Sequence, residues 1–192
     1  LPDKYRPYVQ GIRQETEALG GVVTNFLNFA RPHPVAFAPV DVERLARRAA
    51  DDLQHELPAG THVEVTGDFA DIQGDELLLR QVFSNLLRNA AEACESAGVT
   101  PTIRIKGATD RTHGTCRVIV EDNGPGIPAA VRDKVFRPFF TTRSRGTGLG
   151  LAIVQKIVLT LHGRVTVGAT AAGGASIELA FRLVAPQEIS AL

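Results

Sequence analysis

Residues 121–128 read Glu-Asp-Asn-Gly-Pro-Gly-Ile-Pro and directly follow residues 115–121, whose apolar side chains alternate. Alternation predicts a strand, so the carboxyl group of Asp122 is expected at a strand end. Asp, Asn, Gly and Pro also form tight turns, and a simple turn would account for this stretch as well. Under a binding interpretation, Gly124 and Gly126 let a flat ligand approach the backbone. The acceptor-only carboxylate of Asp122 then selects a ligand with a donor, such as the amino group of adenine.

Upstream, residues 75–97 are predicted to form a long helix that closes at Gly98. Asn85, Asn89 and Glu92 stand at positions i, i+4 and i+7, so they share one face of this helix. Asparagines within such an apolar run are costly to bury unless they bind something. Polar side chains at the edge of an amphipathic helix would explain the pattern equally well.

Downstream, Gly146-Thr147-Gly148-Leu149-Gly150-Leu151 opens a predicted helix over residues 148–161. Free backbone N–H groups at a helix N-terminus can cradle phosphates. The stretch is not a Walker loop, and Leu151 stands where a dinucleotide fingerprint requires a third glycine. Arg143 and Arg145, just upstream, are placed to meet phosphate charge.

Between these stretches lies Phe136-Arg-Pro-Phe-Phe-Thr-Thr-Arg143, a predicted loop of aromatic and polar residues. Phe136, Phe139 and Phe140 are suited to fix the base of this loop, and packing into the core is an equally good and compatible explanation. Each stretch alone is weak evidence. Their order (asparagine helix, strand with Asp-x-Gly-x-Gly, aromatic loop, glycine-rich helix start) predicts a single binding site.

The predicted elements mix helices and antiparallel-looking strand pairs without strict βαβ alternation, which favours an α+β two-layer sandwich over a doubly wound sheet. Helices are predicted over residues 41–57, 75–97, 129–135 and 148–161, and strands over residues 62–66, 101–107, 115–121, 164–169 and 175–183. Before them, residues 3–31 are predicted to form a helix with one apolar stripe, as in a bundle. Arg31-Pro32-His33-Pro34 cannot continue that helix. We therefore expect a helical segment (1–31), a linker (32–40), a globular domain (41–184) and a C-terminal tail (185–192).

The composition narrows the function classes. Of 192 residues, 21 are Lys or Arg and 21 are Asp or Glu, so no global basic field exists for nucleic acid or an anionic membrane. Cys94 and Cys116 are too few for a disulfide scaffold or a zinc site. No uninterrupted apolar stretch reaches about 18 residues. Methionine is absent, even at position 1, so we expect a piece of a longer polypeptide.

At this point the chain resembles the catalytic and ATP-binding domain of two-component sensor histidine kinases, in the GHKL superfamily, over about residues 40–184. Residues 85–92 match its N box, 122–126 its first glycine box, 136–143 its F box and 146–151 its second glycine box. The Pro-Phe-Phe-Thr-Thr form and the short lid resemble the nitrogen-regulation type. Residues 3–31 resemble the second helix of the family's dimerisation and phosphotransfer hairpin. The resemblance implies a Bergerat-type ATP-binding fold with ATP and Mg²⁺ as cofactors.

The resemblance also implies roles for single residues. Asn89 would coordinate Mg²⁺ through its amide oxygen, and Asp122 would bond the adenine amino group. Arg143 stands where the family often has lysine and would act with Asn89 in catalysis. The ATP-binding set implied by the boxes is Asn85, Asn89, Glu92, Asp122, Gly124, Gly126, Ile127, Phe136, Thr142, Arg143, Gly146, Thr147, Gly148, Leu149 and Gly150.

Two departures from the family bear on the reaction. The phosphoacceptor motif, His-Glu followed by x-x-Asn-Pro or a close variant, is absent, and His55-Glu56-Leu57-Pro58 is only a partial mimic inside the catalytic domain. We expect the acceptor histidine on a hairpin helix that precedes residue 1. ATP-hydrolysing relatives such as gyrase B carry a Glu base at the position of Asn85, which is a poor base. This favours phosphoryl transfer over hydrolysis.

Two alternatives stay open: a GHKL-type ATPase module, and a nucleotide-binding or dimerisation module without catalysis. For the leading interpretation, the resemblance implies a homodimer of the parent protein through its hairpin and a response regulator as partner. We expect no nucleic acid partner, no direct membrane contact from these residues, and a cytoplasmic location whether or not the parent is anchored in a membrane.

Overall fold

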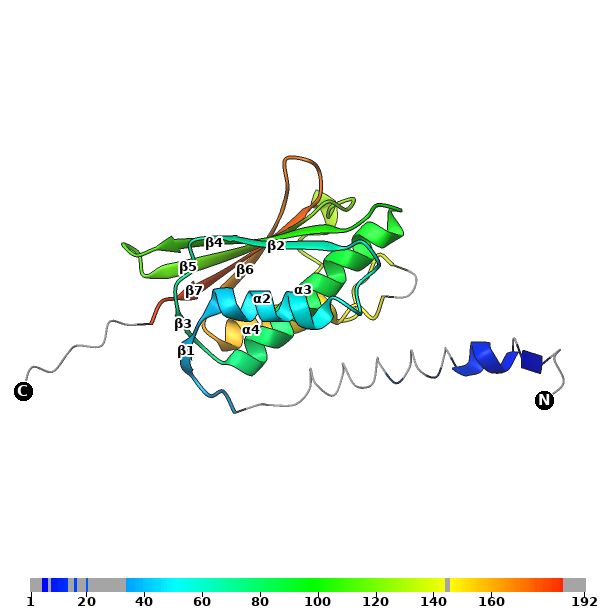
Figure 1. Ribbon diagram of the computed structural model, residues 1–192, viewed down its shortest axis with the longest axis horizontal. Helices are drawn as coiled ribbons and strands as arrows, with labels where there is room; N and C mark the ends of the chain where they lie inside the picture. The colour runs from blue at the N-terminus through cyan, green and yellow to red at the C-terminus, as the bar shows by residue number, and fades with distance from the viewer. Residues whose placement is uncertain are drawn as a thin grey trace, which may run out of the picture.

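The computed structural model describes residues 34–143 and 146–184, and before them residues 5, 6, 8–13, 16 and 20. Three helices cover one face of a five-stranded sheet, which confirms the predicted two-layer α+β sandwich (Figure 1). The elements, in order, are β1 (Ala38–Val40), α2 (Val42–Leu53), β2 (His62–Gly67), β3 (Ile72–Gly74), α3 (Glu76–Ser96), β4 (Thr102–Asp110), β5 (Thr115–Asp122), the 3-10 turn η2 (Ala129–Val131), α4 (Gly150–Thr160), β6 (Arg164–Ala169) and β7 (Ala175–Arg182).

The large sheet has the strand order β2-β4-β5-β7-β6. The β2–β4 pair is parallel and the three other pairs are antiparallel. β5 is the central strand, so Asp122 at its end lies between two neighbouring strands. β1 and β3 form a separate antiparallel ribbon, which a bridge from Ile72 to Leu183 connects to the end of β7.

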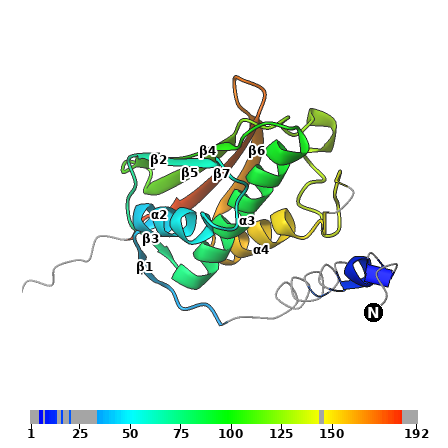
Figure 2. The same cartoon turned by 45° about the vertical axis from the view of Figure 1, so that its right-hand side comes forward.

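Helix α3 runs across the sheet between α2 and α4 (Figure 2). It begins where the Asp75 side chain accepts a hydrogen bond from Leu78 N, at 3.1 Å, a standard N-cap. One side of α3 is fully buried, with Leu79, Phe83 and Leu87 at 0–1% exposure. Burial of each such side chain contributes roughly 1.5–3 kcal/mol. Because that side holds the helix against the sheet, the opposite side, with Asn85, Asn89 and Glu92, is left available to other groups.

Several predicted elements differ in extent from the observed ones. The helix predicted over residues 129–135 is only the turn η2, because successive bonds such as Lys134 N to Val131 O (2.8 Å) span three residues rather than four. The helix predicted to reach residue 57 ends at Leu53, and turns then carry Leu57 into the core. Helix α4 begins at Gly150 rather than residue 148, because Gly148 has φ +65°, outside the helical region.

The sequence did not predict β1 or β3, and β1 occupies residues 38–40 of the predicted linker. Ahead of it, residues 6, 8–13, 16 and 20 are helical, and Thr16 Oγ1 donates to Ile12 O at 2.8 Å, one turn back. Most of the remaining predicted helix and the tail at 185–192 lie outside the described residues. Within the part of the chain that the structure describes, no helix is long and apolar enough to cross a membrane.

Candidate functional site

Asp122 ends β5 with its carboxylate held in place by backbone donors. Its Oδ1 accepts hydrogen bonds from Gly124 N at 2.9 Å and from Ala175 N at 3.1 Å. Burial is the main influence on this group and raises the pKa of Asp122, against the opposing effects of both N–H groups and of the Arg143 charge. The result is a partly desolvated, fixed acceptor at the end of the central strand.

The loop after Asp122 is packed between α3 and the β6–β7 hairpin. A Cβ on Gly124 would lie 3.1 Å from Asp122 Oδ1 and 3.4 Å from Ala93 on α3. Gly126 has φ +72°, and a Cβ there would collide with the carbonyl oxygen of Gly173 in the hairpin. A Cβ would be crowded at Gly124 and would clash at Gly126, so packing within the protein accounts for both glycines. The approach of a flat ligand to this loop stays a prediction.

Asn89 faces the first residue of α4. A Cβ on Gly150 would lie 3.0 Å from Asn89 Nδ2 and 3.1 Å from its Oδ1. Nδ2 is buried and has no hydrogen-bond partner among the described residues. A buried amide nitrogen without a partner costs free energy, which makes this side chain a candidate for contact with a ligand.

Arg143 connects the 136–149 loop, of which the structure describes all but residues 144 and 145, to α3. Its Nη1 lies 2.6 Å from Glu92 Oε2, and its Nη2 donates to the backbone oxygen of Asn89 at 2.9 Å. The Arg143 side chain is 31% exposed and that of Glu92 is 57% exposed. The guanidinium therefore lies beside Asn89, and its charge acts to lower the pKa of Asp122.

Residues 74–185 match a family model described as histidine kinase-, DNA gyrase B- and HSP90-like ATPase. The chain belongs to this ATPase family. Over 181 residues it is 30% identical to the signal transduction histidine-protein kinase AtoS of Escherichia coli K12, covering 91% of the chain and 29% of AtoS. It is 33% identical to the sensory histidine kinase/phosphatase NtrB of Rhodobacter capsulatus, covering 93% of the chain and 52% of NtrB. The chain thus spans about half or less of the length of these two curated relatives.

Solved structures agree with this family assignment. Full-length ShkA in complex with AMPPNP superimposes with a TM-score of 0.76 at 29% identity, over 97% of this chain and 41% of ShkA. The mycobacterial sensor histidine kinase MprB superimposes with a TM-score of 0.67 at 28% identity, over 77% of this chain and 97% of that chain. The predicted resemblance to sensor histidine kinases and the fold it implied are both confirmed.

Phe139 of the F box (136–143) contacts Gly148 of the second glycine box (146–151). Phe139 N donates to Gly148 O at 2.9 Å, and a Cβ on Gly148 would collide with the Phe139 backbone. Phe139 itself has φ +66°, an uncommon conformation for a non-glycine residue. Thr147 Oγ1 accepts from Leu149 N at 3.4 Å, and Leu149 is fully buried where α4 begins. The 136–149 loop is therefore closed at its base by backbone contacts.

Other residues of the predicted set lie apart from this cluster or contribute differently. Asn85 Nδ2 donates to Gln81 O in its own helix at 2.9 Å, one turn below Asn89. Ile127 packs against the hydrophobic core, Phe136 is half-buried, and Thr142 is exposed. Gly146 N donates to Arg143 O at 3.3 Å. Arg145, also considered from the sequence, lies outside the described residues.

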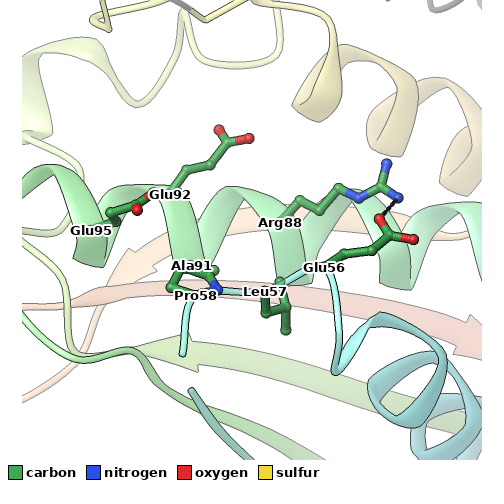
Figure 3. Close-up of a pocket in the computed structure, with 7 residues that line it drawn as sticks. All are labelled: Glu56, Leu57, Pro58, Arg88, Ala91, Glu92 and Glu95. Atoms are coloured by element: carbon green, nitrogen blue, oxygen red, sulfur yellow. Dashed lines mark hydrogen bonds and ion pairs between the residues drawn. The ribbon is translucent and has the colours of Figure 1, made fainter. Parts of the chain in front are cut away.

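A shallow pocket of about 260 Å³ lies on the α2 side of α3 (Figure 3). Arg88 Nη2 there forms an ion pair with Glu56 Oε2 at 2.5 Å, so the glutamate of the partial His55-Glu56 mimic is bound to α3. The residues that line the pocket are Glu56, Leu57, Pro58, Arg88, Ala91, Glu92 and Glu95.

The sequence reasoning missed the residues that support the cluster, Ala93, Asn123, Gly173 and Ala175. Three of them act through backbone atoms or small size, which leave no chemical signature in a sequence. Asn123 was visible only as one of several turn-forming residues.

Proposed function

We propose that this chain is the ATP-binding kinase module of a two-component sensor histidine kinase, which transfers the γ-phosphate of ATP to a histidine on its parent protein's helical hairpin. One observation carries the proposal: two groups of residues suited to the two ends of a nucleotide both lie against α3. The fixed carboxylate of Asp122 bonds to Gly124, which packs against α3, and Asn89 on α3 contacts Arg143 and faces Gly150. That arrangement offers an acceptor for a base at one end and positive charge with free N–H groups at the other.

Asp122 would select the base. In its ionised form it accepts hydrogen bonds only, so it suits the exocyclic amino group of adenine and repels the carbonyl that guanine presents at that position. Gly124 and Gly126 add no side chain of their own beside the carboxylate, and a Cβ on Gly124 would lie 3.1 Å from Asp122 Oδ1.

Arg143 and the N-terminus of α4 would hold the phosphates. Among the described residues, no side-chain cap closes the start of α4, so its first backbone N–H groups would be available to phosphates. The Arg143 guanidinium is already oriented by Glu92 and by the Asn89 carbonyl. In phosphoryl transfer, positioning and charge neutralisation supply most of the catalysis, so these residues need only align the γ-phosphate with the incoming histidine.

The Asn89 side chain fits a magnesium site. Mg²⁺ prefers oxygen ligands and usually takes only one or two from protein, with substrate phosphates and waters completing its shell. The amide oxygen of Asn89 would be such a ligand, and its buried Nδ2, which has no partner among the described residues, could donate to a phosphate oxygen. Among the described residues, no group of three or more His, Cys, Asp and Glu side chains could hold a metal ion. When bound, the ion would neutralise phosphate charge.

Transfer to a histidine is favoured over hydrolysis by the environment of Asn85. Its amide is a poor general base, and its nitrogen bonds within α3. The partners follow from this reaction: a second copy through the hairpin, and a response regulator that receives the phosphate. The histidine kinase ThkA, 24% identical to this chain, has been crystallised with the response regulator protein TrrA. A kinase that uses ATP and a response regulator would work in the cytoplasm.

A titration with a fluorescent ATP analogue, with and without Mg²⁺ and competed by ATP and GTP, tests the binding site. We expect adenine-selective, Mg²⁺-sensitive binding that Asp122→Asn and Asn89→Ala both weaken. No binding would instead support the dimerisation-module alternative.

Incubation with γ-labelled ATP and a separately produced histidine-kinase hairpin tests the reaction. We expect acid-labile label on the hairpin histidine and little free phosphate. Steady-state release of phosphate without transfer would support the ATPase alternative.

A further inference from the structure

Asn123 lies between Asp122 and Gly124, yet its side chain bonds to a different part of the molecule. Its Oδ1 accepts from Thr102 N, at the start of β4, at 2.7 Å. Its Nδ2 donates to Thr100 O at 3.0 Å. The same Oδ1 accepts from Cys94 Sγ in the last turns of α3 at 3.2 Å. One side chain therefore bonds the Asp122 loop to the whole α3–β4 connection.

These bonds lie on the path that joins the two halves of the proposed site. Asn89 and Glu92 are on α3 directly before Cys94, and Asp122 directly precedes Asn123. Without the Asn123 carbonyl, Thr102 N at the start of β4 would lose its acceptor. The loop would then gain freedom where Asp122 needs a fixed direction.

We propose that Asn123 is a positioning residue of the nucleotide site, which holds the Asp122 carboxylate in register with α3 so that adenine and phosphates are bound at the correct spacing. This inference rests on the proposed function. Asn123 acts through Asp122 and the loop backbone. Its loss therefore disturbs base selection more than it disturbs the fold, because the core on the inner face of the sheet is formed by other residues.

Cys94 provides a readout that needs no nucleotide. Its side chain is fully buried, and burial, followed by the nearby Asp122 charge, raises the pKa of its thiol, so we expect slow labelling in the folded protein. Removal of the Asn123 amide takes away the group that covers the sulfur on the loop side. Thiol labelling, located by peptide mass spectrometry to separate Cys94 from the buried Cys116, reports whether the loop opens.

The variants are Asn123→Ala, which removes all three bonds, and Asn123→Asp, which keeps an acceptor but loses the donor to Thr100 O. The matched control is Asp110→Ala, at the other end of the β4–β5 hairpin, where Asp110 Oδ1 accepts from His113 N at 2.9 Å. Each variant is assayed for ATP and GTP affinity, Cys94 labelling rate and free energy of unfolding. Asn123→Asp keeps the test usable if Asn123→Ala folds poorly.

We expect Asn123→Ala to weaken ATP binding at least tenfold, to lower the ratio of ATP to GTP affinity, and to speed Cys94 labelling at least tenfold. Asn123→Asp should show a smaller change in the same direction, and Asp110→Ala should change neither affinity nor labelling. If the unaltered chain binds ATP but Asn123→Ala leaves the ratio of ATP to GTP affinity or the Cys94 labelling rate unchanged, the role of Asn123 is overturned. The proposed function would not be affected by that result. Absence of ATP binding by the unaltered chain would overturn the proposed function, and this role with it.

Discussion

The side-chain amide of Asn89 lies against the backbone of Gly150, the first residue of α4, so closely that a Cβ on Gly150 would be 3.0 Å from Nδ2. Two helices that are distant in the sequence therefore meet at a polar group and a bare backbone rather than at two apolar side chains. This close approach places the start of α4 next to Asn89, the proposed magnesium ligand. A bound phosphate could then contact the N–H groups of α4 and the metal ion at the same time.

Replacement Gly150→Ala should separate binding from stability. Alanine favours a helix interior over glycine by about 1 kcal/mol, which offsets part of the cost of the tight contact with Asn89, so the free energy of unfolding should change little. The new methyl group must displace the Asn89 amide, and we expect nucleotide affinity to fall about tenfold, or 1.4 kcal/mol. Gly168→Ala is the control, because its Cβ would have only ordinary contacts, the nearest at 3.8 Å. Unaltered affinity in Gly150→Ala would contradict the role of this contact.

The ionisation of Asp122 should appear in the pH dependence of stability. Burial raises the pKa of this carboxyl above its ordinary 3.8. The folded state then binds the proton more tightly than the unfolded state, so this group's contribution to the free energy of unfolding falls as the pH rises from the unfolded to the folded pKa. Asp122→Asn keeps an acceptor for both N–H groups and removes the charge. We therefore expect it to be the more stable protein at neutral pH, while adenine binding is weakened.

Denaturant unfolding of both proteins between about pH 3 and pH 7 measures this effect as a difference curve. Taking the difference removes the effect of other carboxyl groups that titrate in the same range. Asp110 is one of them: its hydrogen bonds with His113 lower its pKa, so it contributes with the opposite sign, and equally in both proteins. ATP affinity of the unaltered chain should rise with pH through the folded pKa of Asp122. A flat difference curve would show that the carboxyl is not desolvated.

Arg143, which lies beside Asn89, and Arg88, which contacts Glu56 after α2, form a matched pair of arginines. Both contact a glutamate, at 2.6 Å for Arg143–Glu92 and 2.5 Å for Arg88–Glu56. We expect Arg143→Ala to weaken nucleotide binding at least tenfold, because it removes the charge beside the phosphates. Arg88→Ala should leave affinity unchanged and cost less than about 1 kcal/mol of stability, as exposed ion pairs do. If Arg88→Ala weakened nucleotide binding as much as Arg143→Ala, the loss would reflect the net charge of the protein and would contradict a specific role for Arg143.

Asp75 uses its two carboxylate oxygens for two different segments. Oδ1 caps α3 through Leu78 N at 3.1 Å, and Oδ2 accepts from Ala36 N at 3.0 Å, ahead of β1. Asp75→Ala should lose both bonds and about 1 kcal/mol or more of stability. Asp75→Ser keeps a capping oxygen and should lose less, while amide exchange at Ala36 accelerates in both variants. Slow exchange at Ala36 in Asp75→Ser would show that the stacking of Phe37 on His162, with ring centroids 5.6 Å apart, holds this segment unaided.

The long elements were predictable from local chemistry. Helix α3 was expected over residues 75–97 and spans Glu76–Ser96, because Asp75 caps its start and Gly98 closes its end. β6 was expected at 164–169 and is observed there. β1 and β3 were missed because each has three residues and is stabilised by pairing with the other, Ala38 with Gly74, which no local pattern encodes.

The same division holds for the candidate site. The sequence pointed to Asn89, Asp122 and Gly150 as candidate site residues because of their order along the chain. An amide on a helix, a carboxylate at a strand end and a glycine at a helix start together suit one kind of ligand, a nucleotide. The sequence did not reveal what supports them, since Gly124 N and Ala175 N are backbone donors that any residue type could supply. Nor did it distinguish Asn123 from an ordinary turn residue, because its three partners lie in other elements.

The bond from Ala175 N to Asp122 also sets an order of events during synthesis. β5 pairs with β4 on one side and with β7 on the other, and Ala175 follows Asp122 by 53 residues. A nascent chain that has left the ribosome only as far as α4 already contains all four boxes. Its strand β5 still lacks β7 as a neighbour, however, and the Asp122 carboxylate has only one of its two backbone donors. Under the proposed function, ATP could therefore stabilise a folding chain only after the β6–β7 hairpin has formed, because Ala175 N completes the acceptor that would bind adenine.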